Sequence, residues 1–392
     1  MPLTSRQRGP IAVYGATGYT GKLIAAELAA SGVEFVLAGR NGEKLDALAK
    51  DLTGAASGGS RTGGGEIPTR AVGLDDPDGL RDLLRDCAAV IACAGPFTLH
   101  GEPVLEAAVD TATHYLDTTG EQTWMRTAFE DYGPKAEAAG TSVIPAMGFD
   151  YVPGDMIAAM TAQGMGEVDE VLLAYNVNGF GMTRGTQLSG LEMVAGGDVE
   201  WRKLKWMPAD QSIGRGHFEF PQPIGRQRMI RYPAGEQITV PRHVATRKVR
   251  TMITASTVAP SALGPVLPLL TRPTGLAMRT PLRKVVGRII DRLPEGPKLE
   301  DRQAARFTIV CDVIRGGDAR RGVIRGSDVY GLTAAAIVRG AIVASRGGSP
   351  GSGALAPSQA FEPAEFLAAL DSFGVSWDVQ ESNAPIPTTA SA

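Results

Sequence analysis

Gly15, Gly18 and Gly21 stand at three-residue intervals, a spacing that could hold a phosphate group. They follow the apolar run Ile11–Tyr14, which predicts a strand, and precede residues 22–30, where apolar side chains recur at helical spacing. In such a strand–turn–helix unit the glycines let the backbone approach a pyrophosphate, and the positive end of the helix faces it. A tight turn without a ligand is the alternative, because glycines alone are a weak signal. The predicted phosphate contacts are Gly15, Ala16, Thr17, Gly18, Tyr19, Thr20 and Gly21.

The end of the next predicted strand, Glu34–Ala38, indicates which nucleotide this turn would bind. It lies about 20 residues beyond the glycines, where an acidic residue would bind the ribose of NAD. The sequence instead has Gly39, Arg40 and Asn41 there. An arginine can pair with a 2′-phosphate and stack on adenine, whereas a carboxylate would repel the phosphate. We therefore predict NADP(H) as the cofactor, with Arg40 and Asn41 in its site; a plain surface charge at Arg40 is the alternative.

A second loop would border the other half of the cofactor. The fourth predicted strand lies across the switch point of the sheet from the first, so the loop that follows it would pass the nicotinamide. Phe97, at the end of this loop, is either a wall of the pocket or a core residue. The predicted contacts are Ala94, Gly95, Pro96 and Phe97.

Proton donors are expected near the carboxyl ends of the strands, and the candidates are His100, Asp117, Asp150 and Tyr151. Tyr151 is the first choice, because a phenol can donate a proton and also hydrogen-bond an enolate oxygen. Each has a structural alternative. Tyr151 could be a packed aromatic residue, Asp150 could cap the helix that follows, and His100 could be an ordinary loop histidine.

The elements that must position these residues alternate between strand and helix up to about residue 150. This pattern predicts a Rossmann-type, doubly wound parallel sheet with helices on both faces, in a domain covering 1–150. Alternating strands later in the chain, such as 305–315, predict an α+β domain with a mainly antiparallel sheet over 151–330. Residues 331–392 are predicted to be helices that pack back on the first domain, followed by a disordered tail.

Several motifs together are similar to the saccharopine dehydrogenase-like oxidoreductases, and more closely to their actinobacterial trans-acting enoyl reductase branch. The resemblance is dense over about the first 155 residues, with Tyr330-Gly-Leu-Thr-Ala-Ala as a late echo. It implies an NADP-binding Rossmann domain, an α+β domain that covers the active site, and an unsaturated acyl or polyketide substrate, free or on a carrier protein. The motifs begin at Gly15 (GATGYTG), Ala38 (AGRN), Ala94 (AGPF), Tyr115 (YLDTTGE) and Gly148 (GFDYVPGD).

The charge, the cysteine content and the apolar runs of the sequence limit the kinds of partner that it is expected to have. The net charge of −3 implies no general attraction to nucleic acid. Three widely spaced cysteines, Cys87, Cys93 and Cys311, indicate neither a disulfide framework nor a metal site. No apolar run is long enough to span a membrane, so a cytoplasmic protein is expected. A homodimer remains open.

Residues 276–293 place five basic side chains and several large apolar ones on different faces of a predicted helix. Such a helix suits an acyl carrier protein or peripheral contact with an anionic membrane, or it packs on the core with a solvated basic face.

The sequence thus predicts an NADPH-dependent oxidoreductase, an enoyl reductase acting on an acyl or polyketide lipid substrate. Two alternatives stay open: a dehydrogenase that forms or cleaves a secondary amine, and a non-catalytic NADP-sensing protein.

Overall fold

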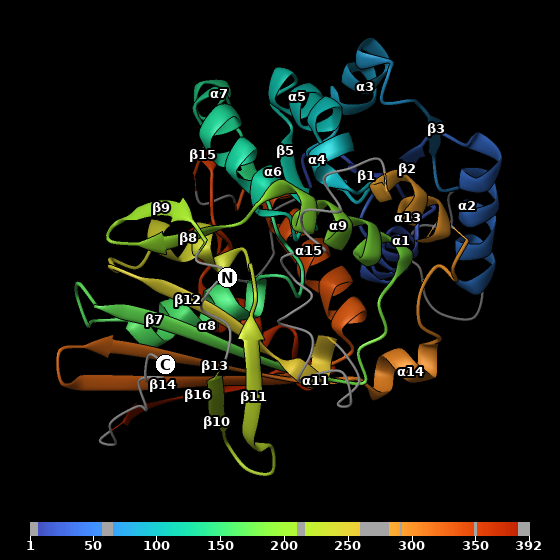
Figure 1. Ribbon diagram of the computed structural model, residues 1–392. Helices are drawn as coiled ribbons and strands as arrows, with labels where there is room; N and C mark the ends of the chain where they lie inside the picture. The colour runs from blue at the N-terminus through green and yellow to red at the C-terminus, as the bar shows by residue number, and fades with distance from the viewer. Residues whose placement is uncertain are drawn as a thin grey trace. The chain divides into compact units, whose positions relative to one another are not determined.

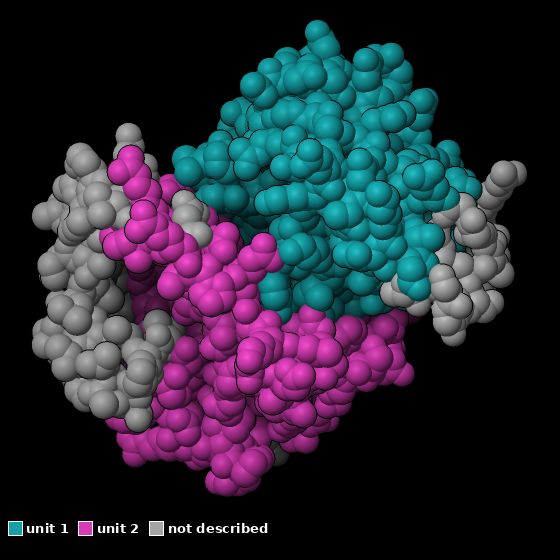
Figure 2. Space-filling model, turned by 90° about the vertical axis from the view of Figure 1, so that its right-hand side faces the viewer, with its two compact units in different colours: residues 1–150, 330–361 teal, residues 151–329, 362–392 magenta. Residues whose placement is uncertain are grey.

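The chain forms two compact units (Figure 2). Unit 1 contains residues 1–150 and 330–361, and unit 2 contains residues 151–329 and 362–392. Each unit has its own seven-stranded sheet. The computed structural model (Figure 1) describes residues 7–56, 66–209, 216–258, 282–290, 292–348 and 351–382.

The sheet of unit 1 is parallel throughout, in the order β15-β6-β5-β4-β1-β2-β3. The first six strands thus have the order 3-2-1-4-5-6 of dinucleotide-binding folds. The central strands are short apolar runs that are buried along their whole length, as expected where helices cover both faces. The strands are β1 (Ile11–Tyr14), β2 (Phe35–Gly39), β3 (Thr69–Ala71), β4 (Ala89–Ala92), β5 (His114–Asp117), β6 (Ser142–Ile144) and β15 (Gly353–Ala354).

Local signals explain several helix ends in unit 1. Asp76 caps α3 by accepting a hydrogen bond from the Gly79 N–H (2.9 Å), and Pro77 occupies the first turn. Gly32 ends α1 in the left-handed conformation (φ 67°). Residues 122–139 form α6, a π-helical turn and α7 in succession, with Pro134 at the start of α7. The helices are α1 (Tyr19–Ser31), α2 (Gly42–Ala56), α3 (Pro77–Leu84), α4 (Phe97–His100), α5 (Glu102–Asp110), α6 (Gln122–Thr127), the π-helix Ala128–Tyr132, α7 (Gly133–Ala139), α15 (Val329–Ser345) and α16 (Pro357–Ala360).

Unit 2 has a mixed sheet in the order β10-β11-β12-β7-β13-β14-β16, in which the β12–β7 pair is parallel and the other pairs are antiparallel. The predicted fold class, a Rossmann-type sheet with a second, mainly antiparallel sheet, is therefore confirmed. The strands are β7 (Glu170–Asn178), β10 (Gly216–Phe220), β11 (Gly225–Arg231), β12 (Val249–Thr254), β13 (Arg306–Arg315), β14 (Asp318–Ser327) and β16 (Ser376–Ser382), and β8 (Val199–Arg202) and β9 (Lys205–Pro208) form a separate hairpin.

Strand β13 differs from the one-sided burial that its sequence alternation suggests. Residues Phe307 to Val313 are buried on both faces, because α8 covers one face and apolar residues such as Phe218 cover the other. The buried carboxylate of Asp312 is tolerated there because Arg321 binds both of its oxygens, at 2.6 and 2.7 Å.

The helices of unit 2 include one element of the predicted basic segment. Within 276–293 the structure describes α13, whereas 276–281 and residue 291 lie outside the described residues. The predicted tail from residue 383 also lies outside them. The helices are α8 (Val152–Ala162), α9 (Arg184–Gly196), α10 (Glu236–Thr239), the 3₁₀ turn Val240–Arg242, α11 (Ala255–Val258), α13 (Leu282–Ile290), α14 (Leu299–Ala304), α17 (Pro363–Ala368) and the 3₁₀ turn Asp371–Phe373.

The end of the chain differs from the expectation that all of 331–392 belongs with the first domain. Residues 330–361 do lie in unit 1, but the following residues return to unit 2. The reason is strand pairing: β16 is hydrogen-bonded along β14 and forms the last strand of that sheet.

Candidate nucleotide-binding site

The turn between β1 and α1 needs two of its three glycines for steric reasons. Gly15 has a φ of +86°, and a Cβ there would lie 3.0 Å from the backbone nitrogen of Ala94. A Cβ at Gly21 would lie 2.4 Å from the carbonyl oxygen of Gly15. At Gly18 the nearest atom would be that same oxygen at 3.5 Å, an ordinary contact, and Gly18 is exposed. The open position is therefore the one where a pyrophosphate would approach.

Helix α1 begins at this turn in a way that suits an anion. Its capping residue is Gly18, in an extended conformation, so the cap itself supplies no side-chain acceptor. No acidic residue stands in the first turn, Tyr19 to Lys22, and the Lys22 N–H donates to the Gly18 carbonyl (2.9 Å). The positive end of the helix dipole is thus not neutralised by a side chain of its own first turn.

The end of β2 lies beside this turn. The N–H groups of Gly15 and Ala16 donate to the carbonyl of Ala38 (3.0 and 3.3 Å), two residues before Arg40. Arg40 is exposed and lies near the Tyr14 hydroxyl: burial raises the pKa of Tyr14, and the positive charge of Arg40 opposes that shift. An exposed guanidinium at this point fits the 2′-phosphate of NADP.

Asn41, the second residue predicted for this end of the cofactor, has a structural role. Its side-chain oxygen accepts a hydrogen bond from the Lys44 N–H (2.9 Å) and so holds the first turn of α2.

The loop after β4 reaches the same edge of the sheet, since Ala94 contacts Gly15 as described above. Gly95 is exposed, whereas Phe97 is 4% exposed and its ring stacks on Trp124 with the centroids 6.4 Å apart. Of the two interpretations of Phe97, the structure favours the core residue.

Glu121 holds this loop in place and was not among the predicted site residues. Its two carboxylate oxygens accept hydrogen bonds from the N–H groups of Phe97 (2.8 Å) and Thr98 (2.9 Å) at the start of α4. Glu121 is 2% exposed. The available signal was its place directly after β5, in the sequence Asp117-Thr-Thr-Gly-Glu121, but its partners lie 24 and 23 residues away.

Asp117 is fully buried, and its carboxylate accepts four hydrogen bonds. The donors are the Trp124 indole (2.7 Å), the Tyr115 hydroxyl (3.0 Å) and the N–H groups of Thr119 and Ala146 (3.0 Å each). Burial raises its pKa, and the hydrogen bonds oppose that shift. This arrangement assigns Asp117 to joining β5, α6 and the segment after β6, not to proton donation.

The start of α15 packs against the same edge from a distant part of the chain. Tyr330 is buried, and its ring meets the ring of Tyr19 edge-on at 5.5 Å. The Thr333 hydroxyl accepts a hydrogen bond from the Phe149 N–H (3.0 Å). The motif that begins at Tyr330 therefore packs at the same edge of the unit 1 sheet as the glycine turn.

Comparison with known families agrees with this geometry. Residues 11–144 match the family model described as the saccharopine dehydrogenase NADP binding domain. This part of the chain is therefore similar to the NADP-binding domain of saccharopine dehydrogenases. The match confirms the predicted family resemblance and the predicted cofactor, NADP(H).

Two curated relatives match the chain over part of their length. A trans-acting enoyl reductase of Mycobacterium bovis is 30% identical over 216 residues, which are 53% of this chain and 50% of the relative. A lipid droplet localized protein of Caenorhabditis elegans is 30% identical over 155 residues, which are 38% of this chain and 35% of the relative. The matched region thus spans half or less of these relatives.

The fold extends beyond the NADP-binding domain. Saccharopine dehydrogenase (L-Glu forming) from Saccharomyces cerevisiae superimposes with a TM-score of 0.58 at 14% identity, covering 95% of this chain and 100% of that one. Both units therefore take part in a fold similar to that of saccharopine dehydrogenase.

The predicted proton donors are not all in the NADP-binding domain. His100 is exposed at the end of α4, and Asp150 is the last residue of the first segment of unit 1. Tyr151 is the first residue of unit 2, is fully buried, and lies with its ring 6.2 Å from that of Tyr232. Tyr151 occupies the capping position of α8, one residue after Asp150.

The environments of the three cysteines are apolar enough to raise the pKa of each thiol. Burial raises the pKa of Cys87 to about 11 and that of Cys93 to about 12, and it raises that of Cys311 well above its ordinary value. Among the described residues, no group of three His, Cys, Asp or Glu side chains could hold a metal ion. No described helix is long and apolar enough to cross a membrane.

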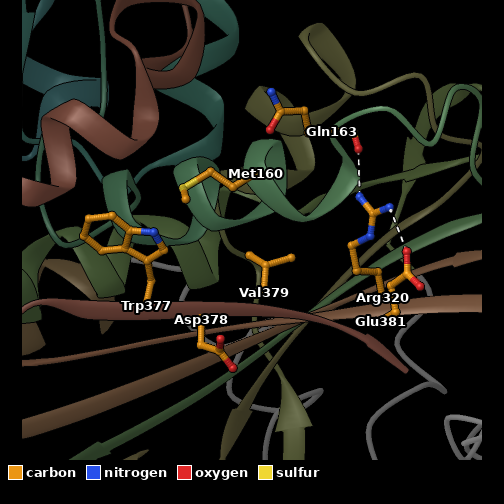
Figure 3. Close-up of a pocket in the computed structure, with 7 residues that line it drawn as sticks. All are labelled: Met160, Gln163, Arg320, Trp377, Asp378, Val379 and Glu381. Carbon is orange, nitrogen blue, oxygen red and sulfur yellow. Dashed lines mark hydrogen bonds and ion pairs between the residues drawn. The ribbon is translucent and has the colours of Figure 1, made fainter. Parts of the chain in front are cut away.

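A cavity of about 490 Å³ is lined by residues of unit 2 (Figure 3). Arg320, which lines it together with Asp378 and Glu381, donates hydrogen bonds to the carbonyls of Thr161 (3.2 Å) and Gln163 (2.7 Å) at the end of α8. Trp377 and Met160 face the same space in Figure 3. The guanidinium thus satisfies the carbonyls of a helix C-terminus, which is a structural role.

Proposed function

We propose that the chain is an NADPH-dependent reductase that acts on a C=C bond conjugated to a thioester, in an acyl or polyketide substrate. The observation that carries the NADPH half of this proposal is the open glycine turn with Arg40 exposed beside it. The substrate half is supported by the relative named trans-acting enoyl reductase.

The chain's residues divide the work as follows. Bound NADPH supplies the hydride. The backbone from Gly15 to Gly21 would bind the diphosphate, and Arg40 would bind the 2′-phosphate. The loop from Ala94 to Pro96 would border the nicotinamide, held by Glu121.

Reduction also needs a proton at the second carbon and stabilisation of the enolate oxygen. Tyr151 is the proposed donor, because a phenol can donate a proton to carbon or a hydrogen bond to the enolate oxygen. Asp150 and His100 are the other candidates.

The similarity to saccharopine dehydrogenase over 95% of the chain favours a second candidate, a dehydrogenase that forms or cleaves a secondary amine. The two candidates differ in the acceptor of the hydride: an electron-poor carbon–carbon bond in one, an imine in the other. A protein that binds NADP without turnover is the third.

Purified full-length protein tests all three. Binding of NADPH and NADH is measured by calorimetry, and cofactor oxidation is followed by absorbance with enoyl thioesters and with imines formed from amino acids and oxo acids. Oxidation with enoyl thioesters alone supports the proposal, and oxidation with imines alone supports the amine dehydrogenase. Tight NADPH binding without oxidation by either class supports the NADP-binding protein.

A further inference from the structure

A second hollow in unit 2 is lined mainly by apolar side chains. It has a volume of about 560 Å³, within the range of ligand pockets. One wall is the loop between β7 and α9, and the other is the segment from the end of α13 to α14. Its apolar lining comes from Phe180, Met182, Leu293, Pro294, Pro297 and Ala304, and its polar side chains are Gln187 and Asp301.

The two walls of this groove are tied together. Arg184, at the start of α9, donates hydrogen bonds from Nε and Nη2 to the carbonyl of Leu293 (3.2 and 2.6 Å). Its backbone N–H donates to the carbonyl of Glu295 (3.0 Å). A Cβ on Gly181 would lie 3.1 Å from the Cβ of Pro297, so the walls are in close contact there. The groove is therefore built into the fold by specific bonds between segments about 110 residues apart.

Exposed apolar surface is concentrated around this groove. Among the described residues, six large apolar side chains are strongly exposed. Four of them lie in its walls, in α13 or in α14: Met182 (42%), Ile289 (57%), Leu293 (38%) and Leu299 (54%). Exposed apolar side chains gathered in this way mark binding sites more often than scattered ones do.

Basic charge adjoins the groove. Helix α13 packs against α9 (Figure 1) and carries Arg288 in its last turn, with no acidic residue within its bounds. Arg288 is exposed, and so is Arg292, directly before the groove residue Leu293. An apolar groove beside a basic helix complements a ligand with an apolar chain and an anionic end.

We propose that this groove binds the alkyl chain of an acyl thioester, with the phosphates of its carrier held by the exposed side chains of Arg288 and Arg292. The inference rests on the proposed function for the thioester, whereas the chain-binding site rests on the groove alone. The groove would then select substrates by the length of the alkyl chain.

The test is direct binding of a fluorescent long-chain acyl-coenzyme A, at a concentration where it is monomeric, to the full-length protein without NADPH. Met182→Glu and Leu293→Glu each place a charge in the groove at a side chain exposed enough to leave the core unchanged. Leu204→Glu is the matched control, because Leu204 is 58% exposed at the tip of the β8–β9 hairpin in the same unit and outside the groove. Thermal unfolding checks that all three variants fold.

The expected result is that the two groove variants bind the probe about tenfold more weakly or worse, while Leu204→Glu binds like the original protein. Equal loss in the control, or no loss in the groove variants, would overturn the proposal. Failure of the probe to bind, with groove-dependent binding to vesicles of anionic phospholipid, would also overturn it and would make the groove a membrane contact.

A second readout separates this inference from the proposed function. If the protein reduces enoyl thioesters, the groove variants should raise KM for long chains and leave kcat and the KM of a four-carbon thioester unchanged. If no enoyl thioester is reduced, the proposed function fails, but probe binding still reports on the groove.

Discussion

At the scale of single residues, the nucleotide site depends on glycines that lack a side chain at the turn after β1 and on the positive charge of Arg40 after β2. Gly15 and Gly21 are required by neighbouring backbone atoms, whereas Gly18 is open, so the three equally spaced glycines have different roles. The glycine turn and Arg40 were predictable because they come directly after the apolar runs of β1 and β2, whereas the contact that requires Gly15 comes from Ala94, in the loop after β4.

Arg40→Ser should weaken NADPH binding by roughly 10- to 100-fold, the value of a lost charge-assisted contact. NADH binding should change little, because NADH has no 2′-phosphate. Calorimetric titration with both cofactors measures the two affinities, and Arg85→Ser, at another exposed arginine of unit 1, is the control. Equal weakening of both cofactors would show that Arg40 does not contact the 2′-phosphate.

The three thiols should react slowly in the folded protein at pH 8. Burial holds the pKa of Cys87 near 11 and that of Cys93 near 12 and raises that of Cys311, so each stays protonated, and the thiolate is the reactive form. A chromogenic disulfide reagent should label the native protein far more slowly than the denatured one, in which all three react. One rapidly labelled thiol in the native protein would contradict this.

At the scale of elements, buried carboxylates hold the loops at the edge of the first sheet. Glu121 and Asp117 find their partners in α4, α6 and the segment after β6. From the sequence, Asp117 and Glu121 are simply two acidic residues at the end of a predicted strand, and such residues could be either structural or catalytic. Which N–H groups they meet depends on how separate loops fold back, and sequence periodicity carries no information on that.

Glu121→Gln should lower the free energy of unfolding by about 1–3 kcal/mol, because a neutral amide accepts less strongly and offers only one acceptor oxygen to the N–H groups of Phe97 and Thr98. Urea unfolding measures the change, and Glu106→Gln, on the exposed face of α5, is the matched control. NADPH affinity should fall as well, since the loop after β4 loses its anchor. An unchanged free energy of unfolding would show that the hydrogen bonds from Glu121 to the loop after β4 do not stabilise the fold.

His114 should make stability depend on pH. Its ring joins β5 to β6 through the Ser142 hydroxyl (2.8 Å), and burial, with Arg8 nearby, lowers its pKa below the ordinary value of 6.5. As the pH falls below 6.5, His114 binds a proton in the unfolded chain more readily than in the folded protein. Protonation therefore favours the unfolded state, and the free energy of unfolding falls. Between pH 7 and 5 the free energy of unfolding should fall more in the original protein than in His114→Gln.

Urea unfolding at several pH values measures that slope. His217→Gln, at an exposed histidine of β10, should retain the slope of the original protein. Identical slopes for His114→Gln and the original protein would show that His114 titrates alike in both states.

At the scale of the whole molecule, the alternation of strands and helices was enough to predict two sheets of different kinds. Contacts between segments that are far apart in the sequence were not predictable in the same way. Tyr330 meets Tyr19 from the far end of the chain, and β16 joins β14 after a segment in unit 1. Such pairings depend on complementary surfaces, and several strand partners would satisfy the same apolar pattern.

NADPH should raise the thermal unfolding midpoint of the full-length protein, because a ligand that binds only the native state stabilises it by about 2.7 kcal/mol at 100 times its Kd. Scanning calorimetry with NADPH, with NADH and without cofactor measures the shift. Arg40→Ser should lose the NADPH shift at the same concentration. A shift of equal size with NADH would contradict the assignment of the 2′-phosphate.

The two units are interleaved along the chain, which passes between them at 150/151, 329/330 and 361/362. Strand β6 gains its outer neighbour β15 only after residue 353 has been made, and α15 lies against β5 closely enough that a Cβ on Gly340 would meet Leu116 at 3.0 Å. A ribosome must therefore synthesise most of the protein before the first sheet is complete. Residues 1–150 on their own lack α15 and β15, so no single continuous segment of the chain contains the whole of the first unit.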